Sequence, residues 1–407
     1  MLAKAMRRRL CLGRSCFASP HSRGLDLVQK EVRGIRMKMK KWMILCFWAI
    51  LLVPNLLWPA LSSRLTAEGE NAEKRELAPF PRLDRENLQG YPAAVEAYIN
   101  DHAAFRDQLL SLNAGINLTL FQSVDNPEVI VGEEGWYFYN GGASVADYRG
   151  QNLYQEEELA LIAAKLEAVR QYHENRGTLF IVLLAPNKES IYGDYMPKWY
   201  TKLSDTTRYD QVEQVLRERT NIPVVSPKAY FLEERDLEWY FKTDTHWNEA
   251  GAFVAGQMLI DAAGGQAVTV EDVIIPFEQR DRGDLAMLFH MPESFLDDRF
   301  CVVHGYYDEV SVQSSDPKGD GSVLKDQASD APDPRRLAFY GDSFVPVMLS
   351  KISRYFRNVD FYHWQTFDLA FLDQDPPDIL VYEVVERELG RILEDADKLM
   401  PGLAGEK

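Results

Sequence analysis

The stretch RRLAFYGDSFVPVM, residues 335–348, predicts an apolar strand ending at Gly341 and a helix with Pro346 in its first turn. Ser343 therefore lies in a strand-to-helix turn. Such a turn projects a serine hydroxyl from the edge of a sheet, near backbone N–H groups that can stabilise an oxyanion. The alternative is that Ser343 only caps the helix, as serine often does. Taken alone, this stretch favours the cap.

A second stretch, YFKTDTHWNEAGA at 240–252, changes that balance because it supplies an acid and a base. In an extended segment, side chains two residues apart share a face. Asp244 can then hold one imidazole nitrogen of His246 and leave the other nitrogen for a serine or a substrate. Asp244 could instead be a simple helix cap, or the pair could bind a metal. The other six histidines show no ligand spacing with this pair, so we expect no metal and no cofactor. With Ser343, the two residues indicate an enzyme.

Short apolar strands alternate with helices from residue 155 onward, which predicts an α/β fold with a mostly parallel sheet covered on both faces. Ligands bind beyond the carboxyl ends of the strands in such sheets. The expected helices are 155–175, 206–220, 249–263 and 345–357, and the expected strands are 178–188, 222–225, 336–341, 359–364 and 378–385. Before this region we expect one amphipathic helix, 93–121, and a hairpin within 128–141. Residues 313–334 are predicted to be a polar loop.

The N-terminal part has a separate organisation. Residues 1–41 are basic, with twelve Lys or Arg and two acids, and residues 42–63 carry no formal charge. That uncharged run can cross the ~30 Å hydrocarbon core of a membrane, and its basic flank predicts a cytoplasmic N-terminal side. A cleaved signal peptide is the alternative. Either way we expect the rest to be exported, as a linker at 64–90 and one domain at 91–400.

Charge and cysteine content narrow the function further. The whole chain carries −17 and residues 1–41 carry +10, which leaves −27 on residues 42–407. A body this acidic disfavours nucleic acid as a partner. Cys301 is the one cysteine after residue 63, so we expect neither an intramolecular disulfide nor a cysteine-based zinc site in the exported body.

The two stretches, in this order, resemble the exported SGNH-hydrolase-like proteins of alginate O-acetylation, the AlgX/AlgJ-like group. TDTHWNEAGA and YGDSF carry the specific part of the resemblance, and YINDHAAFRD, GEEGWYFY, APNKESIY and PDILVYEVVERELGRI support it. The likeness covers roughly residues 90–395. It implies a three-layer sandwich with a mostly parallel central sheet, permuted relative to ordinary SGNH esterases because Asp-x-His precedes the serine.

The resemblance also implies roles and partners. Ser343 would be the nucleophile, His246 the general base and Asp244 the residue that orients it. The chain would be a membrane-anchored, extracytoplasmic O-acetyltransferase acting on an exported or cell-surface polysaccharide. A membrane-bound O-acyltransferase would supply the acetyl group. An exported carbohydrate esterase with the same triad and a non-catalytic scaffold of a polysaccharide export complex are the alternatives.

Five further residues are candidates for substrate binding. Asn187 and Lys188 end an apolar strand, and a turn with a solvated lysine is the alternative for them. Tyr362 lies near the end of another strand. Trp247 could stack on a sugar or belong to the core. Arg387 could contact substrate or form a supporting ion pair with Glu386.

Overall fold

A computed structural model of the chain describes residues 37–50, 52–54, 56–57, 77–83, 88–269, 274–279, 283–296, 299–365, 369 and 371–400. The chain divides into two compact units, residues 1–106 and 107–407. In the first unit, residues 37–50 are helical and α2 spans Tyr91–Asp101. The Ala78 N–H donates to the Asp101 carboxylate over 2.8 Å, and Phe80 packs edge-on against Tyr98.

The predicted membrane span falls only partly on described residues. Residues 51, 55 and 58–63 of the 42–63 run lie outside them, as do residues 1–36 and most of the predicted linker. Among the helices that the structure describes, none combines the length and the apolar character that a membrane crossing requires.

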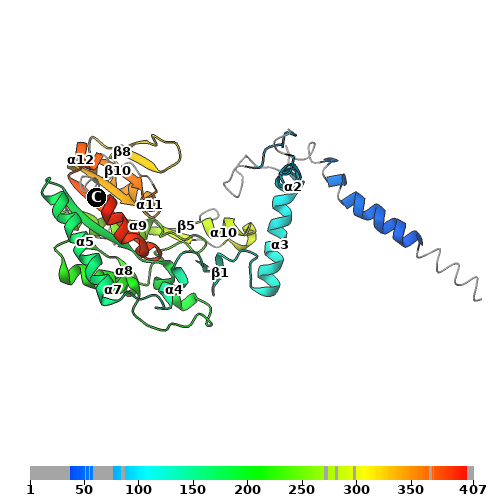
Figure 1. The fold of residues 1–407 in the computed structure, drawn as a ribbon, viewed down its shortest axis with the longest axis horizontal. Coiled ribbons are helices and arrows are strands. Elements are labelled where there is room, and N and C mark those ends of the chain that lie inside the picture. Colours follow the sequence, from blue (N-terminus) through cyan, green and yellow to red (C-terminus); the bar gives the residue numbers. More distant parts are fainter. Residues whose placement is uncertain are drawn as a thin grey trace, which may run out of the picture. The chain divides into compact units, whose positions relative to one another are not determined.

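The second unit is built on a seven-stranded sheet (Figure 1). Its strand order is β4-β3-β11-β9-β10-β8-β7, with bounds β3 Leu179–Ala185, β4 Val224–Val225, β7 Gln313–Ser315, β8 Val323–Gln327, β9 Asp333–Gly341, β10 Phe356–His363 and β11 Ile379–Val385. The five strands from β4 to β10 run parallel, and β8 and β7 add an antiparallel edge. The sheet is therefore mixed, and its mostly parallel part confirms the α/β prediction.

Both faces of the sheet are buried, as the continuous apolar strands indicated. Along β3, Ile181, Leu183 and Ala185 pack into one core cluster, while the alternate residues Phe180, Val182 and Leu184 pack into another. The first cluster includes residues of α9 Glu249–Ala262 and α11 Val345–Ile352, and the second includes residues of α5 Glu156–Glu174, α7 Arg208–Arg219 and α13 Ile392–Lys398. The sheet is thus the middle layer of three.

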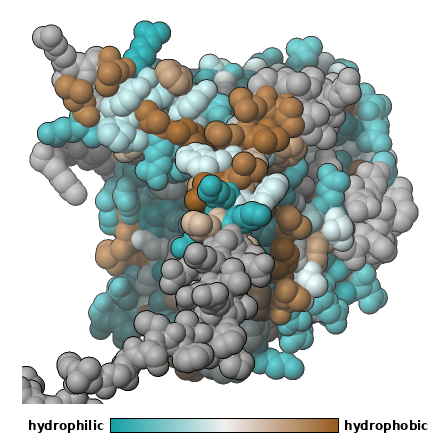
Figure 2. Space-filling view, turned by 90° about the vertical axis from the view of Figure 1, so that its right-hand side faces the viewer, coloured by the Kyte–Doolittle hydropathy of each residue, from teal (hydrophilic) through white to brown (hydrophobic). Residues whose placement is uncertain are grey.

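The remaining elements lie outside the seven-stranded sheet. Two small antiparallel pairs form, β1 Val129–Val131 with β2 Tyr137–Tyr139 and β5 Ile274–Gln279 with β6 Arg299–Val303. The further helices are α3 Arg106–Phe121, α4 Ser144–Tyr148, α6 Lys188–Ile191, α8 Lys228–Glu233, α10 Asp284–Leu288 and α12 Phe371–Gln374, with 3₁₀ turns η1 Gly193–Tyr195, η3 Glu293–Phe295 and η4 Glu386–Arg391. On the face drawn in Figure 2, hydrophobic side chains form separate patches among hydrophilic ones.

Three expectations about elements were wrong. The single helix 93–121 is two helices, α2 and α3, because the chain turns between them and Phe105 adopts a left-handed φ of 59°. Helix α11 ends at Ile352, and β10 begins at Phe356, three residues before its predicted start. The predicted polar loop 313–334 contains β7 and β8, which pair with each other, and β8 extends the sheet by pairing with β10.

Candidate active site

The serine turn is fixed by the acid that precedes Ser343. The Asp342 carboxylate accepts the backbone N–H groups of Phe344 and Val385, both at 3.0 Å, which ties the end of β9 to the end of β11. The Asp342 N–H donates in turn to Glu383 over 2.8 Å. A Cβ on Gly341 would lie 2.6 Å from a Glu383 carboxylate oxygen, so this position requires glycine. These contacts leave Ser343 exposed at the carboxyl edge of the sheet.

The loop that carries Asp244 and His246 is held by a buried cation. The Lys188 ammonium donates to the carbonyl oxygens of Phe241, Lys242 and Asp244 at 3.2, 3.1 and 2.6 Å. After the loop, the Asn248 side chain caps α9 by accepting the Gly251 N–H at 3.0 Å. The loop therefore has fixed contacts at its start and at its end.

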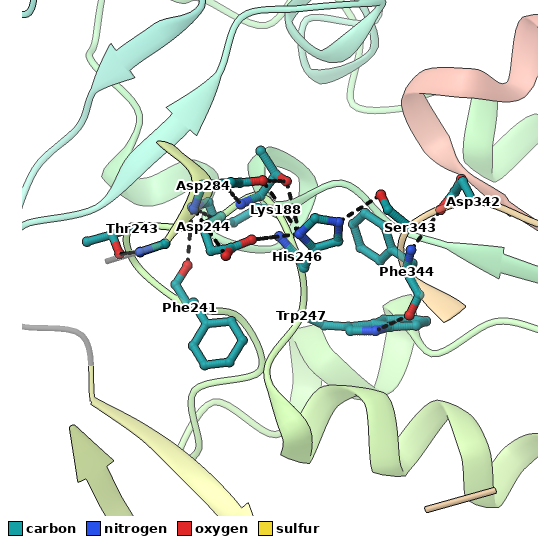
Figure 3. Close-up of polar contacts among 12 residues, drawn as sticks. Lys188, Phe241, Thr243, Asp244, His246, Trp247, Asp284, Asp342, Ser343 and Phe344 are labelled. Carbon is teal, nitrogen blue, oxygen red and sulfur yellow. Dashed lines mark hydrogen bonds and ion pairs between the residues drawn. The ribbon is translucent and has the colours of Figure 1, made fainter. Parts of the chain in front are cut away.

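These two segments bring the predicted triad together (Figure 3). The Ser343 Oγ lies 2.8 Å from His246 Nε2, and His246 Nδ1 lies 2.6 Å from Asp244 Oδ1. The Asp244 Oδ1 also accepts the His246 N–H at 3.0 Å. Asp244 is almost fully buried whereas His246 is partly exposed. One imidazole nitrogen is thus fixed by a carboxylate while the other faces a hydroxyl, the geometry of a general base next to a nucleophile.

Asp284, at the start of α10, is a second carboxylate beside the imidazole, and no sequence motif marks it. Its Oδ1 accepts the Thr245 N–H at 2.7 Å, and its Oδ2 lies 3.5 Å from His246 Nδ1. The Asp284 N–H donates to Asp244 Oδ2 over 3.2 Å. Burial raises the pKa of Asp284 above its usual value, and the Asp244 charge raises it further. Asp284 therefore packs against both parts of the acid–base pair.

Asp284 also changes the assessment of metal binding. Ligand atoms of Asp244, His246 and Asp284 lie within 4.8 Å of one another. Asp284 is thus a third possible metal ligand, which the spacing of the histidines did not indicate. In the observed geometry, however, Asp244 is hydrogen-bonded to Nδ1 and Ser343 to Nε2. Both imidazole nitrogens are thereby engaged in the arrangement that acyl transfer needs.

The hydroxyl and the imidazole open into a pocket of about 400 Å³, within the usual range for small-ligand sites. The pocket lies where β9, β10 and β11 end, as predicted for ligands of a parallel sheet. Its lining comes from six parts of the chain and consists of Glu128, Tyr139, Thr245, His246, Asp284, Leu288, Asp342, Ser343, His363, Trp364, Gln365, Val385, Arg387 and Glu388.

Of the five predicted substrate contacts, only Arg387 lines this pocket. Its guanidinium lies over the rings of Phe344 and Tyr139, at 5.3 and 5.6 Å. The expected ion pair with Glu386 is absent: Glu386 instead accepts the Asn187 N–H and the Ser190 hydroxyl, at 3.0 and 2.7 Å. Among described residues, no ion-pair partner of Arg387 lies within 4.0 Å.

The other four candidate substrate contacts are buried and do not line this pocket. Asn187 is fully buried, and its Oδ1 accepts the Arg387 N–H at 3.3 Å. Lys188 is buried beneath the loop that carries Asp244 and His246. Trp247 is fully buried and donates its indole N–H to the Phe344 carbonyl over 3.0 Å, which joins the histidine loop to the serine turn. Tyr362 is also buried and is not part of the pocket lining. Lys188 and Trp247 thus bond to the segments that carry the site.

Comparisons with known proteins give the family of this chain. A family profile described as "SGNH hydrolase-like domain, acetyltransferase AlgX" matches residues 129–350, a range that includes Asp244, His246 and Ser343. Two curated relatives are both described as "Probable alginate O-acetylase AlgJ". The relative from Pseudomonas putida is 25% identical over 197 residues, covering 47% of this chain and 49% of its own length. The relative from Pseudomonas syringae pv. tomato is 24% identical over 235 residues, with coverages of 55% and 56%. The chain thus spans about half the length of these relatives.

Two solved structures also align with part of this chain. Bacillus cereus PatB1 aligns with a TM-score of 0.49 and 12% identity over 65% of this chain and 96% of its own. The O-acetyltransferase domain of Pseudomonas putida AlgJ aligns with a TM-score of 0.43 and 18% identity over 68% of this chain and all of its own.

Proposed function

This chain belongs to the AlgX-type family of SGNH hydrolase-like acetyltransferase domains, and on that basis we propose that it moves acetyl groups onto hydroxyls of an exported or cell-surface polysaccharide. The observation that carries the proposal is the contact chain from Asp244 through His246 to Ser343 at the mouth of a pocket. Family membership, inferred from two short motifs, is confirmed by the profile match. The acceptor, the donor and the covalent intermediate remain proposals.

The reaction follows from the positions of the three side chains. His246 Nε2 takes the Ser343 proton as Oγ bonds to the carbonyl carbon of an acetyl donor, and the donor's leaving group departs with a proton returned by the imidazole. The resulting acetyl-serine is attacked by a sugar hydroxyl, which gives its proton to the same Nε2. The imidazole passes that proton to Ser343 Oγ as the bond from Oγ to the acetyl carbon breaks. Asp244 holds Nδ1 and stabilises the imidazolium in both steps. Each proton transfer contributes roughly 10²–10⁴-fold.

Location and donor are part of the same proposal. The basic residues before an uncharged run of 22 residues favour export of the body. The uncharged run would be either a membrane anchor or a signal peptide that is cleaved. Outside the cytoplasm, a membrane-bound O-acyltransferase would be a suitable source of the acetyl group, since acetyl-CoA is a cytoplasmic compound. The partner would deliver acetyl groups to Ser343.

An esterase is the second candidate, and the exposure of Ser343 favours it. Water that reaches the acetyl-serine would release acetate instead of transferring the acetyl group. Incubating the full-length protein with an acetyl ester, with and without a glycan, separates the two functions. If the protein is a transferase, most acetyl groups should appear on the glycan. If it is a hydrolase, acetate should be released at the same rate with and without the glycan.

The proposal as a whole is tested in cells that produce this protein and its polysaccharide. Ser343→Ala should abolish acetylation of the surface glycan, because no other group takes the place of the nucleophile. Ser350→Ala, an exposed serine on α11, is the matched control and should leave acetylation intact. Full acetylation in the Ser343→Ala cells would show that the chain acts as a scaffold and not as the enzyme.

A further inference from the structure

The walls of the Ser343 pocket combine aromatic rings with carboxylates. Tyr139, from β2, and Trp364, which follows β10, are both partly exposed and line the pocket. Aromatic side chains present an apolar face beside a polar edge, a combination that suits the C–H faces and hydroxyls of a sugar ring. The pocket is therefore suited to a glycan, and its charges determine which kind.

The charged residues of the lining are mostly acidic. Four acids line the pocket, Glu128, Asp284, Asp342 and Glu388, against one permanent cation, Arg387. His363 adds little positive charge, because burial lowers its pKa. Glu128 is exposed and Glu388 is partly exposed, so both carboxylates face the solvent through which an acceptor must approach.

The charges around the pocket affect the pKa of the Tyr139 hydroxyl, which is raised above its usual value. Burial is the main cause that raises the pKa of this phenol, and the Glu128 charge is the next. Arg387 lowers it, and Glu388 and Asp284 raise it again. Three carboxylates and one guanidinium thus act on the same point, and the single cation is shared with two aromatic rings.

The charge of the whole body acts in the same direction. Residues 42–407 carry −27, because the chain carries −17 and residues 1–41 carry +10. An acceptor with a carboxylate on every sugar would be repelled at long range and would then have to place its charges beside Glu128 and Glu388. Salt weakens both effects.

Building on the proposed transferase function, we propose that the acceptor is a neutral or amino-bearing glycan, and that Glu128 and Glu388 discriminate against polyuronates. A hydroxyl of such a sugar reaches His246 Nε2 without bringing an anion into an acidic pocket. An amino group on the sugar would meet carboxylates that can hold it.

The test compares acceptors that differ only in the carboxylate. The full-length protein in detergent is given an acetyl ester donor and either β-1,4-linked mannose oligomers or mannuronate oligomers of the same length, and acetylated product is measured by mass spectrometry. At low salt we expect kcat/KM to be at least about tenfold higher for the mannose series, and the ratio to fall as salt screens the charges. An equal or higher value for mannuronate would overturn the proposal.

A pair of double variants locates the discrimination. Glu128→Gln with Glu388→Gln should lower the mannose-to-mannuronate ratio several-fold. The matched control is Glu157→Gln with Glu309→Gln, two exposed acids outside the pocket, which makes the same change in net charge and should leave the ratio unchanged. A similar fall in both would assign the selectivity to overall charge and overturn the role of Glu128 and Glu388.

The same samples separate this inference from the proposed function. Acetyl-Ser343 formed from the donor alone supports the function whatever the acceptor preference, so a preference for mannuronate would then refute only the acceptor class. If no acetyl-Ser343 forms and neither oligomer is acetylated, the proposed function itself fails.

Discussion

Lys188 shows how a single buried side chain can hold the loop that carries Asp244 and His246. Its ammonium is buried and donates to three carbonyl oxygens on both sides of Thr243, the residue before Asp244. Each of these oxygens would lose a buried donor if the charge were removed, at a cost of about 1–3 kcal/mol for each group left unpaired. The position of Asp244, and through it that of the His246 ring, depends on these bonds.

We predict that Lys188→Met, which keeps the length of the side chain and removes its donors, lowers kcat roughly 10²-fold, because misplacing a catalytic group by about 1 Å has an effect of that size. The melting temperature should fall as well. Lys198→Met is the control, since the Lys198 side chain is 90% exposed, and it should match the wild type in both measurements. A Lys188→Met protein with unchanged kcat would show that the loop is held by other contacts.

At this scale the sequence predicted which residues meet, but only where local chemistry specified them. The i, i+2 spacing of Asp244 and His246 and the strand-to-helix turn at Ser343 predicted the contacts that the structure contains; their catalytic roles stay a prediction. The position of Asp284 beside His246 could not be predicted, because Asp284 comes from a segment 40 residues after Asp244 that has no motif of its own. Lys188 and Trp247 are predicted as possible substrate contacts, and both are buried. The sequence does not report the direction in which a side chain at a strand end or in a loop points.

Two neighbouring strands, β9 and β11, support the Ser343 turn through a buried acid pair. Glu383, on β11, is fully buried and accepts the Asp342 N–H at 2.8 Å. Burial is the main cause that raises the pKa of Glu383 well above its usual value, and the nearby Asp342 carboxyl adds to the effect. The folded chain therefore keeps a proton on Glu383 at a pH where the unfolded chain has released it.

This proton gives a testable pH dependence of stability. Where the unfolded state binds fewer protons than the folded state, the free energy of unfolding falls as pH rises, by about 1.4 kcal/mol per pH unit for one full proton. The decrease should begin above the ordinary glutamate pKa and continue up to the raised pKa of the folded state. Glu383→Gln keeps an oxygen that accepts the Asp342 N–H but cannot ionise. Denaturant unfolding from pH 5 to pH 8 should therefore show a flatter profile for the variant; identical slopes would contradict the account.

Elements with strong periodicity were predicted well, and elements that depend on tertiary pairing were not. Helices α5, α7 and α9 lie within a residue or two of their expected bounds because their apolar spacing or capping residues are visible in the sequence. Strands β7 and β8 are rich in polar residues, and they form because β10 offers a free edge for pairing. Such edge strands carry little apolar signal of their own.

At the scale of the whole molecule, the sheet order assembles the site from distant segments. Strand β11 lies between β3 and β9, so Asn187 and Arg387, 200 residues apart in the chain, are hydrogen-bonded at one sheet edge. The sequence predicted the layers and the parallel strands, because alternating helices and apolar strands are typical of a parallel sheet with helices on both faces. It could not predict the strand order, and therefore could not predict which six parts of the chain would line the pocket.

The central claim is that this assembly makes Ser343 a covalent carrier of acetyl groups. Intact-mass spectrometry and peptide mapping of the full-length protein, quenched in acid after exposure to an acetyl ester, test it most directly. We predict one acetyl group per chain, located on Ser343 and absent from Ser343→Ala. Acetylation at another residue, or equal labelling of Ser343→Ala, would contradict the account.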